Sequence, residues 1–249
     1  MKCKTVLSLL FFCMLIVDVN GQSTLKLMSY NIHHGVGLDE RLDFNRIAKV
    51  INRKRLDVVA LQEVDSVTQR TGGRDLLGEL GKLTGMQHVY ASAISFDGGK
   101  YGIGLLCRKK PLAIRKIPLP GREEPRMLLI AEFEDYVFCC THLSLMEDDQ
   151  LTSVEKIVKL LENEKKPVFL AGDLNAEPDS PTMMAFKEKF VVLNGEKGKT
   201  IPADNPQSCI DYILGYVAND SRYSVITNYV VNEPVASDHR PVFVSVCIL

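Results

Sequence analysis

The stretch Phe169-Leu170-Ala171-Gly172-Asp173-Leu174-Asn175-Ala176-Glu177-Pro178 decides the fold, because an apolar run ends within it at two polar side chains. The apolar residues from 167 onward begin with proline and predict a buried strand. Asp173 and Asn175 stand where this strand leaves the sheet, and positions i and i+2 of an extended segment point to the same side. A carboxylate and an amide on one side can hold a metal, a water or a phosphate oxygen together.

A polar turn before a helix is the alternative interpretation, with Ser180 as the N-cap and Pro181 as the first helical residue. Taken alone, the stretch supports both interpretations equally. Polar residues also stand at the ends of other apolar runs, where function gathers in α/β sheets. Each is by itself more typical of a turn, a cap or a structural histidine, but together they favour a site: Asn31, Glu63, His142, Asp211, Asp238 and His239.

The pattern of apolar residues predicts α/β layering in one domain. A strand at 25–31, an amphipathic helix at 43–54 and a strand at 57–63 form a crossover unit. Both halves of the chain combine strands with covering helices, which predicts two packed sheets with the helices outside. The further expected helices are 75–83 (ended by Gly85), 149–163 and 181–189, and the further strands are 87–91, 102–108, 113–119, 127–133, 136–142 (together an antiparallel meander), 209–214, 224–231 and 241–248.

Residues 1–21 have the pattern of a cleaved secretory signal. Lys2 and Lys4 precede an apolar run at 6–17, and Val19-Asn20-Gly21 offers short residues to a signal peptidase. The run is shorter than the roughly 20 residues that span a bilayer, so we expect no transmembrane anchor after cleavage. The predicted mature domain is therefore 22–249, and the predicted location is secreted or periplasmic.

Charge and cysteine content narrow the function classes. The 30 basic and 31 acidic residues nearly cancel, and no dense Lys/Arg cluster appears, which argues against long duplex DNA and against a stable nucleic-acid partner. Five cysteines remain after signal cleavage, an odd number that excludes a fully disulfide-stapled scaffold. Which of them pair is left open: Cys107, Cys139, Cys140, Cys209 and Cys247.

Short motifs along nearly the whole mature chain resemble the endonuclease/exonuclease/phosphatase superfamily. This resemblance implies a four-layer α/β/β/α sandwich of two mixed, largely antiparallel sheets, and Mg²⁺-dependent cleavage of phosphoester bonds. The motifs are individually weak and jointly specific: Ser29-Tyr30-Asn31-Ile32, Leu61-Gln62-Glu63-Val64, Thr141-His142-Leu143, Gly172-Asp173-Leu174-Asn175, Ile210-Asp211-Tyr212-Ile213 and Ser237-Asp238-His239-Arg240-Pro241.

The resemblance also implies roles for these residues. Glu63 is the main metal ligand, assisted by Asn31 and Asp238, and the expected ion is Mg²⁺ with Mn²⁺ as a possible substitute. His239 is positioned by Asp211, and either His239 or Asp173 removes the proton of the attacking water. Asn175 and His142 would contact the phosphate, as would Asn31. Arg70 and Arg126 are candidate phosphate partners because guanidinium binds phosphate bidentately.

Two positions depart from the family pattern. His33 replaces an acidic residue that several DNA-cleaving members have near the first asparagine, and Ile103 stands where an asparagine is often found. No Cys/His spacing suits a structural zinc site. The sequence thus predicts a monomeric hydrolase of a small phosphoester, a phospholipid headgroup or nucleic acid. The alternatives are a nuclease acting on DNA or RNA and a non-catalytic phosphate-binding protein.

Overall fold

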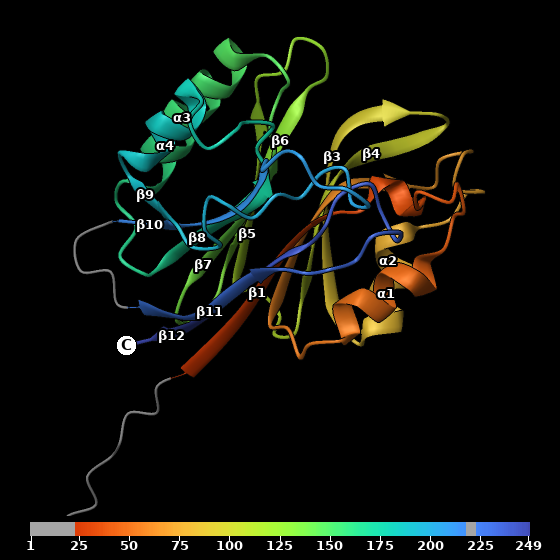
Figure 1. Cartoon of the computed structure of the whole chain (residues 1–249), viewed down its shortest axis with the longest axis horizontal. Coiled ribbons are helices and arrows are strands. Elements are labelled where there is room, and N and C mark those ends of the chain that lie inside the picture. Colours follow the sequence, from red (N-terminus) through yellow and green to blue (C-terminus); the bar gives the residue numbers. More distant parts are fainter. Residues whose placement is uncertain (1–22, 218–222) are drawn as a thin grey trace, which may run out of the picture.

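The computed structural model describes residues 23–217 and 223–249, so the expected signal peptide at 1–21 lies outside the described part. Two six-stranded sheets form the centre of the molecule, each flanked by a pair of helices (Figure 1). The first sheet has the order β11-β12-β1-β2-β4-β3. Its strands are β1 (Ser23–Asn31), β2 (Val58–Ser66), β3 (Gln87–Phe96), β4 (Gly99–Cys107), β11 (Tyr223–Val230) and β12 (Val242–Ile248).

The second sheet has the order β5-β6-β7-β8-β10-β9. In each sheet one central pair is parallel, β1 with β2 and β7 with β8, and the other pairs are antiparallel. A helix connects each parallel pair, as such a crossover requires. The strands of this sheet are β5 (Ala113–Leu119), β6 (Arg126–Glu132), β7 (Val137–His142), β8 (Val168–Asp173), β9 (Phe190–Val192) and β10 (Asp211–Tyr216).

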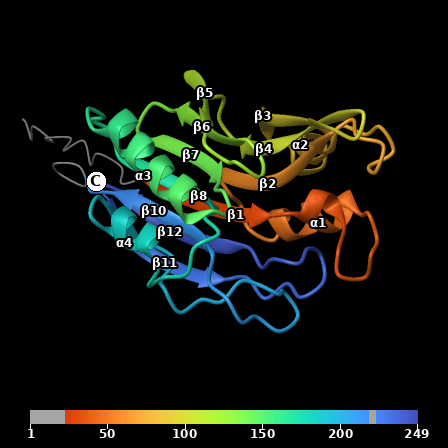
Figure 2. The ribbon, with the colours of Figure 1, turned by 90° about the horizontal axis from the view of Figure 1, so that it is seen from above.

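The helices lie on the outer faces of the two sheets. Helices α1 (Phe44–Asn52) and α2 (Leu76–Thr84) gather on one side, and α3 (Glu147–Leu161) and α4 (Pro181–Lys187) on the other (Figure 2). Three apolar clusters match this layering, one between the sheets and one under each helix pair. The four-layer α/β/β/α sandwich is therefore confirmed.

Local signals set the ends of the helices. Ser180 accepts a hydrogen bond from the Met183 N–H and Pro181 begins α4, so the predicted cap is confirmed. Gly85 ends α2 in the left-handed conformation, with φ of 66°, which glycine adopts without steric cost. All five cysteines in the described part are buried free thiols. Across residues 23–217 and 223–249, the helices are too short or too polar to cross a bilayer.

Two expectations about strands were wrong, and one strand was missed. The meander at 87–142 is divided, because β3 and β4 pair with β2 whereas β5, β6 and β7 belong to the second sheet. Strand β2 continues past Glu63 to Ser66, with Glu63 in an irregularity of the β2–β4 pairing. The short edge strand β9 was missed; its three residues give too little alternation to recognise.

Candidate active site

The two parallel strand pairs deliver their polar ends to the same end of the sandwich. Asn31 ends β1 in one sheet, and His142 and Asp173 end β7 and β8 in the other. In register, Asp173 lies opposite His142 on one side and opposite Asp211 on the other. Strand β1 packs against β8 and β10 across the interface between the sheets. Residues far apart in the sequence therefore meet because the sheets stack face to face.

Asn31 joins carboxylates that come from the two sheets. Its side-chain N–H₂ donates to Glu63 Oε1 and to Asp173 Oδ2, each at 3.0 Å. Its Oδ1 accepts from the backbone N–H of His33 at 3.1 Å. Because a backbone N–H can only donate, this contact fixes the orientation of the amide. The fully buried Asn31 thus faces the two carboxylates with its nitrogen.

Asp173 and Asn175 do not lie side by side along an extended strand, so that expectation was wrong. Asn175 has a left-handed φ of 49°, and its N–H donates to Asp173 Oδ1 at 3.0 Å. A carboxylate that accepts from the backbone two residues on forms an Asx turn, which competes with continued strand. The Asn175 side chain donates to the Leu143 carbonyl at 2.9 Å, which holds its amide in place.

His239 and Asp211 form a buried pair. Nδ1 of His239 lies 2.8 Å from Asp211 Oδ2, and Nε2 lies 3.7 Å from Asp173 Oδ2. Burial would lower the pKa of His239, but the charge and hydrogen bond of Asp211, helped by Asp173 and Asp238, outweigh burial and raise the pKa to about 10. His239 is therefore an imidazolium at neutral pH.

His142 has the opposite electrostatics, although it lies on the other side of the same carboxylate. Its Nε2 is 3.6 Å from Asp173 Oδ2. Burial lowers the pKa of His142 to about 4, with Asp173 opposing that shift and Arg126 adding to it. Asp173 thus lies between a charged imidazole and a neutral one, which gives the site one strong donor and one group that can donate or accept.

Glu63 and two histidines form a group whose chemistry fits a divalent cation. One ligand atom from each of His33, His34 and Glu63 lies within 4.8 Å of the others. Burial raises the pKa of Glu63, as do the charges of Asp238 and Asp173, while the hydrogen bond from Asn31 opposes the rise. A buried carboxylate whose pKa is raised by neighbouring carboxylates is an arrangement that a cation would relieve. The residues present therefore fit a metal ion.

The remaining predicted site residues lie at the margin of this group. Asp238 Oδ1 lies 3.2 Å from Ser237 Oγ. Arg70 forms a bidentate ion pair with the buried Asp65, with Nε 2.6 Å from Oδ2 and Nη2 2.7 Å from Oδ1. Arg126 is 6% exposed and pairs with Glu123 and Glu124 at 3.2 and 3.1 Å. Both arginines therefore already have carboxylate partners, which weakens the expectation that they bind phosphate directly.

Three supporting residues were missed by sequence reasoning. Ser237 donates to the Asn31 carbonyl at 2.8 Å, so it connects the loop before β12 to the end of β1. Gln150 of α3 donates to the Asn175 carbonyl at 2.9 Å and so stabilises the Asx turn. His34 joins the Glu63 group. Only His34 had a visible signal, the adjacent His-His pair directly after the Asn31 motif.

Comparisons with known proteins place this arrangement in a family. The model of the endonuclease/exonuclease/phosphatase family matches residues 28–239. A family member from Bacteroides thetaiotaomicron superposes with a TM-score of 0.74 at 17% identity, covering 92% of this chain and 99% of that chain.

Two solved structures with functional descriptions share the same fold. A mannosyl-6-phosphatase from Bacteroides thetaiotaomicron VPI-5482 matches with a TM-score of 0.71 at 17% identity, covering 89% and 99% of the two chains. The human Nocturnin catalytic domain with bound sulfate matches with a TM-score of 0.67 at 16% identity, covering 91% and 95%. The match of the family model over most of the chain shows that this protein belongs to the endonuclease/exonuclease/phosphatase family.

Proposed function

We propose that the protein is a divalent-metal-dependent hydrolase of phosphoester bonds that uses an in-line water. The observation that carries this proposal is the position of Asp173. Its carboxylate lies between His142 and His239 and shares the Asn31 amide with Glu63. Phosphoryl transfer needs an oriented nucleophile, donors for the phosphoryl oxygens and neutralised charge. Residues able to orient the water, to donate to the phosphoryl oxygens and to hold a cation lie within one cluster.

Each side chain has a role that follows from its contacts. Asp173 Oδ1 and Oδ2 each accept one hydrogen bond from the protein, which fixes the carboxylate and leaves lone pairs to orient a water and take its proton. His239, held charged by Asp211, donates to a phosphoryl oxygen from Nε2. His142 and Asn175 would complete the phosphate contacts. A bound cation at Glu63, near Asp238, supplies charge neutralisation for the phosphate and the leaving oxygen.

We propose Mg²⁺ as the ion that supports turnover, with Mn²⁺ as a substitute, because Glu63 and Asp238 offer carboxylate oxygen. We propose a small phosphoester or a phospholipid headgroup as substrate, since the chain has 30 basic and 31 acidic residues. We also propose secretion or periplasmic export, on the basis of residues 1–21, and a monomer in solution.

A substrate screen tests the proposal. Turnover of bis-p-nitrophenyl phosphate, p-nitrophenyl phosphate, mannose 6-phosphate, sphingomyelin, phosphoinositides and plasmid DNA would be compared in Mg²⁺, Mn²⁺ and EDTA. Mannose 6-phosphate is included because a neighbour of the same fold is a mannosyl-6-phosphatase. We expect turnover of at least one phosphoester that EDTA abolishes. Absence of turnover with every substrate and both ions would favour the non-catalytic phosphate-binding alternative instead.

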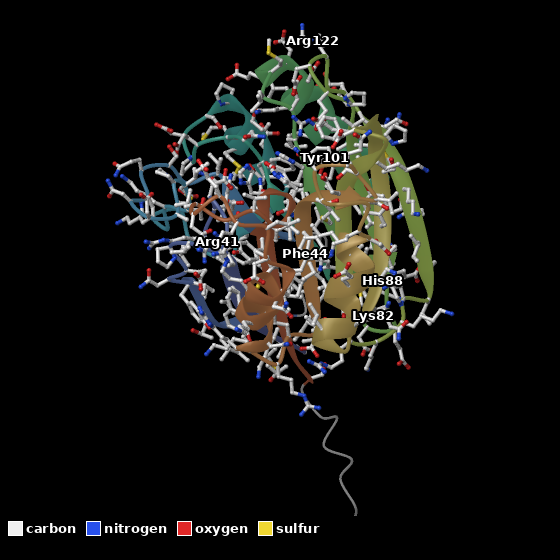
Figure 3. All side chains as sticks on the ribbon, turned by 90° about the vertical axis from the view of Figure 1, so that its right-hand side faces the viewer. Arg41, Phe44, Lys82, His88, Tyr101 and Arg122 are labelled. Carbon is white, nitrogen blue, oxygen red and sulfur yellow. The ribbon has the colours of Figure 1, made fainter. Side chains whose placement is uncertain are left out.

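A variant pair links the activity to this site. His239→Ala should reduce kcat by roughly 10²–10⁴-fold, the usual contribution of a positioned acid or base. His88→Ala is the matched control, because His88 is an exposed histidine of β3. Figure 3 shows it well below Tyr101 on the molecule. Circular dichroism would establish that both variants fold. A His239→Ala enzyme within a few-fold of wild type would contradict the assignment.

A further inference from the structure

The loop after β1 brings two imidazoles to the Glu63 carboxylate. The short helical turn η1 (His33–Gly35) follows Asn31 directly, and Glu63 lies in the neighbouring strand β2. The ligand atoms of His33, His34 and Glu63 lie within 4.8 Å of one another, close enough to share one ion. Two imidazoles with one carboxylate are a ligand set that transition ions accept, whereas Mg²⁺ prefers oxygen throughout.

The structure defines which nitrogen of His33 is available. Nδ1 of His33 lies 3.2 Å from the Val36 carbonyl oxygen. A carbonyl oxygen can only accept, so Nδ1 carries the proton and Nε2 of the neutral ring keeps its lone pair. Metal-binding histidines usually donate their other ring N–H to a backbone carbonyl or carboxylate in this way. The His33 ring is thereby oriented as a ligand before any ion arrives.

His34 also has an unused nitrogen. Its Nδ1 is buried and has no hydrogen-bond partner among the residues that the structure describes. Buried polar atoms are nearly always paired, so such an atom needs an explanation. The His33 and His34 rings stand edge to face, with centroids 4.5 Å apart. The nearby Arg70 is paired with Asp65 through two hydrogen bonds.

The backbone around this group is strained in all three residues. His33, His34 and Glu63 have positive φ angles of 43°, 43° and 57°. Such conformations are uncommon for non-glycine residues and cost of order 1–3 kcal/mol each. Strain of this kind persists where the surroundings hold it, typically at ligand sites. Here it turns the three side chains toward one point.

We propose that His33, His34 and Glu63 bind a divalent transition ion, and bind it more tightly than Mg²⁺. This rests on the proposed function in that Glu63 is the shared metal ligand. It goes further because His33 and His34 determine which ion the protein retains. Each imidazole offers the ion a nitrogen where Mg²⁺ prefers oxygen, so the pair changes the preferred ion class.

Metal binding to the EDTA-stripped protein tests this without any substrate. Dissociation constants for Mg²⁺, Mn²⁺ and Zn²⁺ would be measured by calorimetry, and the visible spectrum of bound Co²⁺ would report nitrogen ligands. The variants are His33→Asn and His34→Asn, because asparagine tolerates a left-handed backbone and lacks the imidazole. His88→Asn, on the exposed face of β3, is the control.

We expect wild type to bind Zn²⁺ and Mn²⁺ at least tenfold more tightly than Mg²⁺. Each site variant should lose at least roughly 10–100-fold in Zn²⁺ affinity, the usual cost of removing even a residue that only orients a metal ligand, with His88→Asn unchanged. His33→Asp, which keeps a ligand at the same position, should shift the preference back toward Mg²⁺, and it replaces His33→Asn if that variant does not fold. Zn²⁺ affinity that is equal in wild type and folded site variants would overturn the proposal.

The outcome is separable from that of the proposed function. Histidine-dependent Zn²⁺ binding in a protein that hydrolyses no phosphoester would support this site and contradict the activity. Mg²⁺-dependent hydrolysis in a protein whose metal affinity is unchanged by His33→Asn and His34→Asn would support the activity and contradict this site.

Discussion

Replacing Asp211 by asparagine should release the proton that His239 holds at neutral pH. The two side chains are 2.8 Å apart, and His239 is only 4% exposed, so solvent does little to screen the pair. Asparagine keeps the size of the side chain and can still accept from Nδ1. The substitution therefore removes the charge while leaving the geometry nearly unchanged.

The magnitude follows from the pKa of His239. Its rise from 6.5 to about 10 corresponds, at about 1.36 kcal/mol per unit, to at most about 5 kcal/mol of preference for the charged form. Without the Asp211 charge, burial still lowers the pKa while Asp173 and Asp238 still raise it, so we expect the pKa of His239 to fall well below 10.

The raised pKa of His239 makes the stability of the fold depend on pH. A folded-state pKa above the unfolded value stabilises the fold fully below pH 6.5, and the stabilisation is lost as pH rises toward 10. Wild type in EDTA should therefore lose unfolding free energy between these pH values. Asp211→Asn should be less stable at pH 6 and much less sensitive to pH above it.

Two measurements decide this prediction. Titration of the His239 ring by NMR in EDTA gives the pKa directly, and urea unfolding at pH 6, 8 and 9.5 gives the stability profile. His239→Asn serves as the control, because it removes the titrating group and should flatten the profile by the same amount. A His239 pKa that is near 6.5 in wild type, or that does not move in Asp211→Asn, would refute the reasoning.

Three further predictions follow from other contacts. Burial lowers the pKa of His142 to about 4, so the fold should lose unfolding free energy as pH falls from 6.5 to 4, because the buried ring must then take up a proton. Urea titrations of His142→Gln should show a weaker loss of stability over this pH range. Ser180→Ala should cost about 1 kcal/mol of unfolding free energy by removing the cap on the Met183 N–H, with Ser180→Gly less costly. Asp65→Asn should destabilise the fold by about 1–2 kcal/mol, because the buried acceptor of the partly exposed Arg70 loses its charge, and Asp65→Asn with Arg70→Met should recover part of that loss.

The parts of the fold set by neighbouring residues were predictable from the sequence. Ser180 and Pro181 specify the start of α4, and Gly85 specifies the end of α2, because each acts within one helical turn. The polar ends of β1 and β8 at Asn31 and Asp173 were visible for a similar reason, since an apolar run stops there.

Long-range pairing was not predictable in this way. The hairpin β3–β4 and the strands β5 to β7 have similar alternation, yet they join different sheets. That division depends on which edge is available beside β2 or β7, and no local pattern records it. The irregularity at Glu63 is likewise set by the β2–β4 register, so no local pattern predicted that β2 would continue beyond Glu63.

The hydrogen bond between Asn31 and Asp173 depends on how the two sheets pack against each other. Asn31 comes from one sheet and Asp173 from the other, so their 3.0 Å contact spans the interface between the sheets. The distance is maintained by the apolar cluster between them, which includes Leu27 of β1 and Phe169 of β8. A shift of about 1 Å in catalytic geometry can cost 10²-fold in rate. The buried residues between the sheets therefore belong to the functional design as much as the polar residues at the strand ends do.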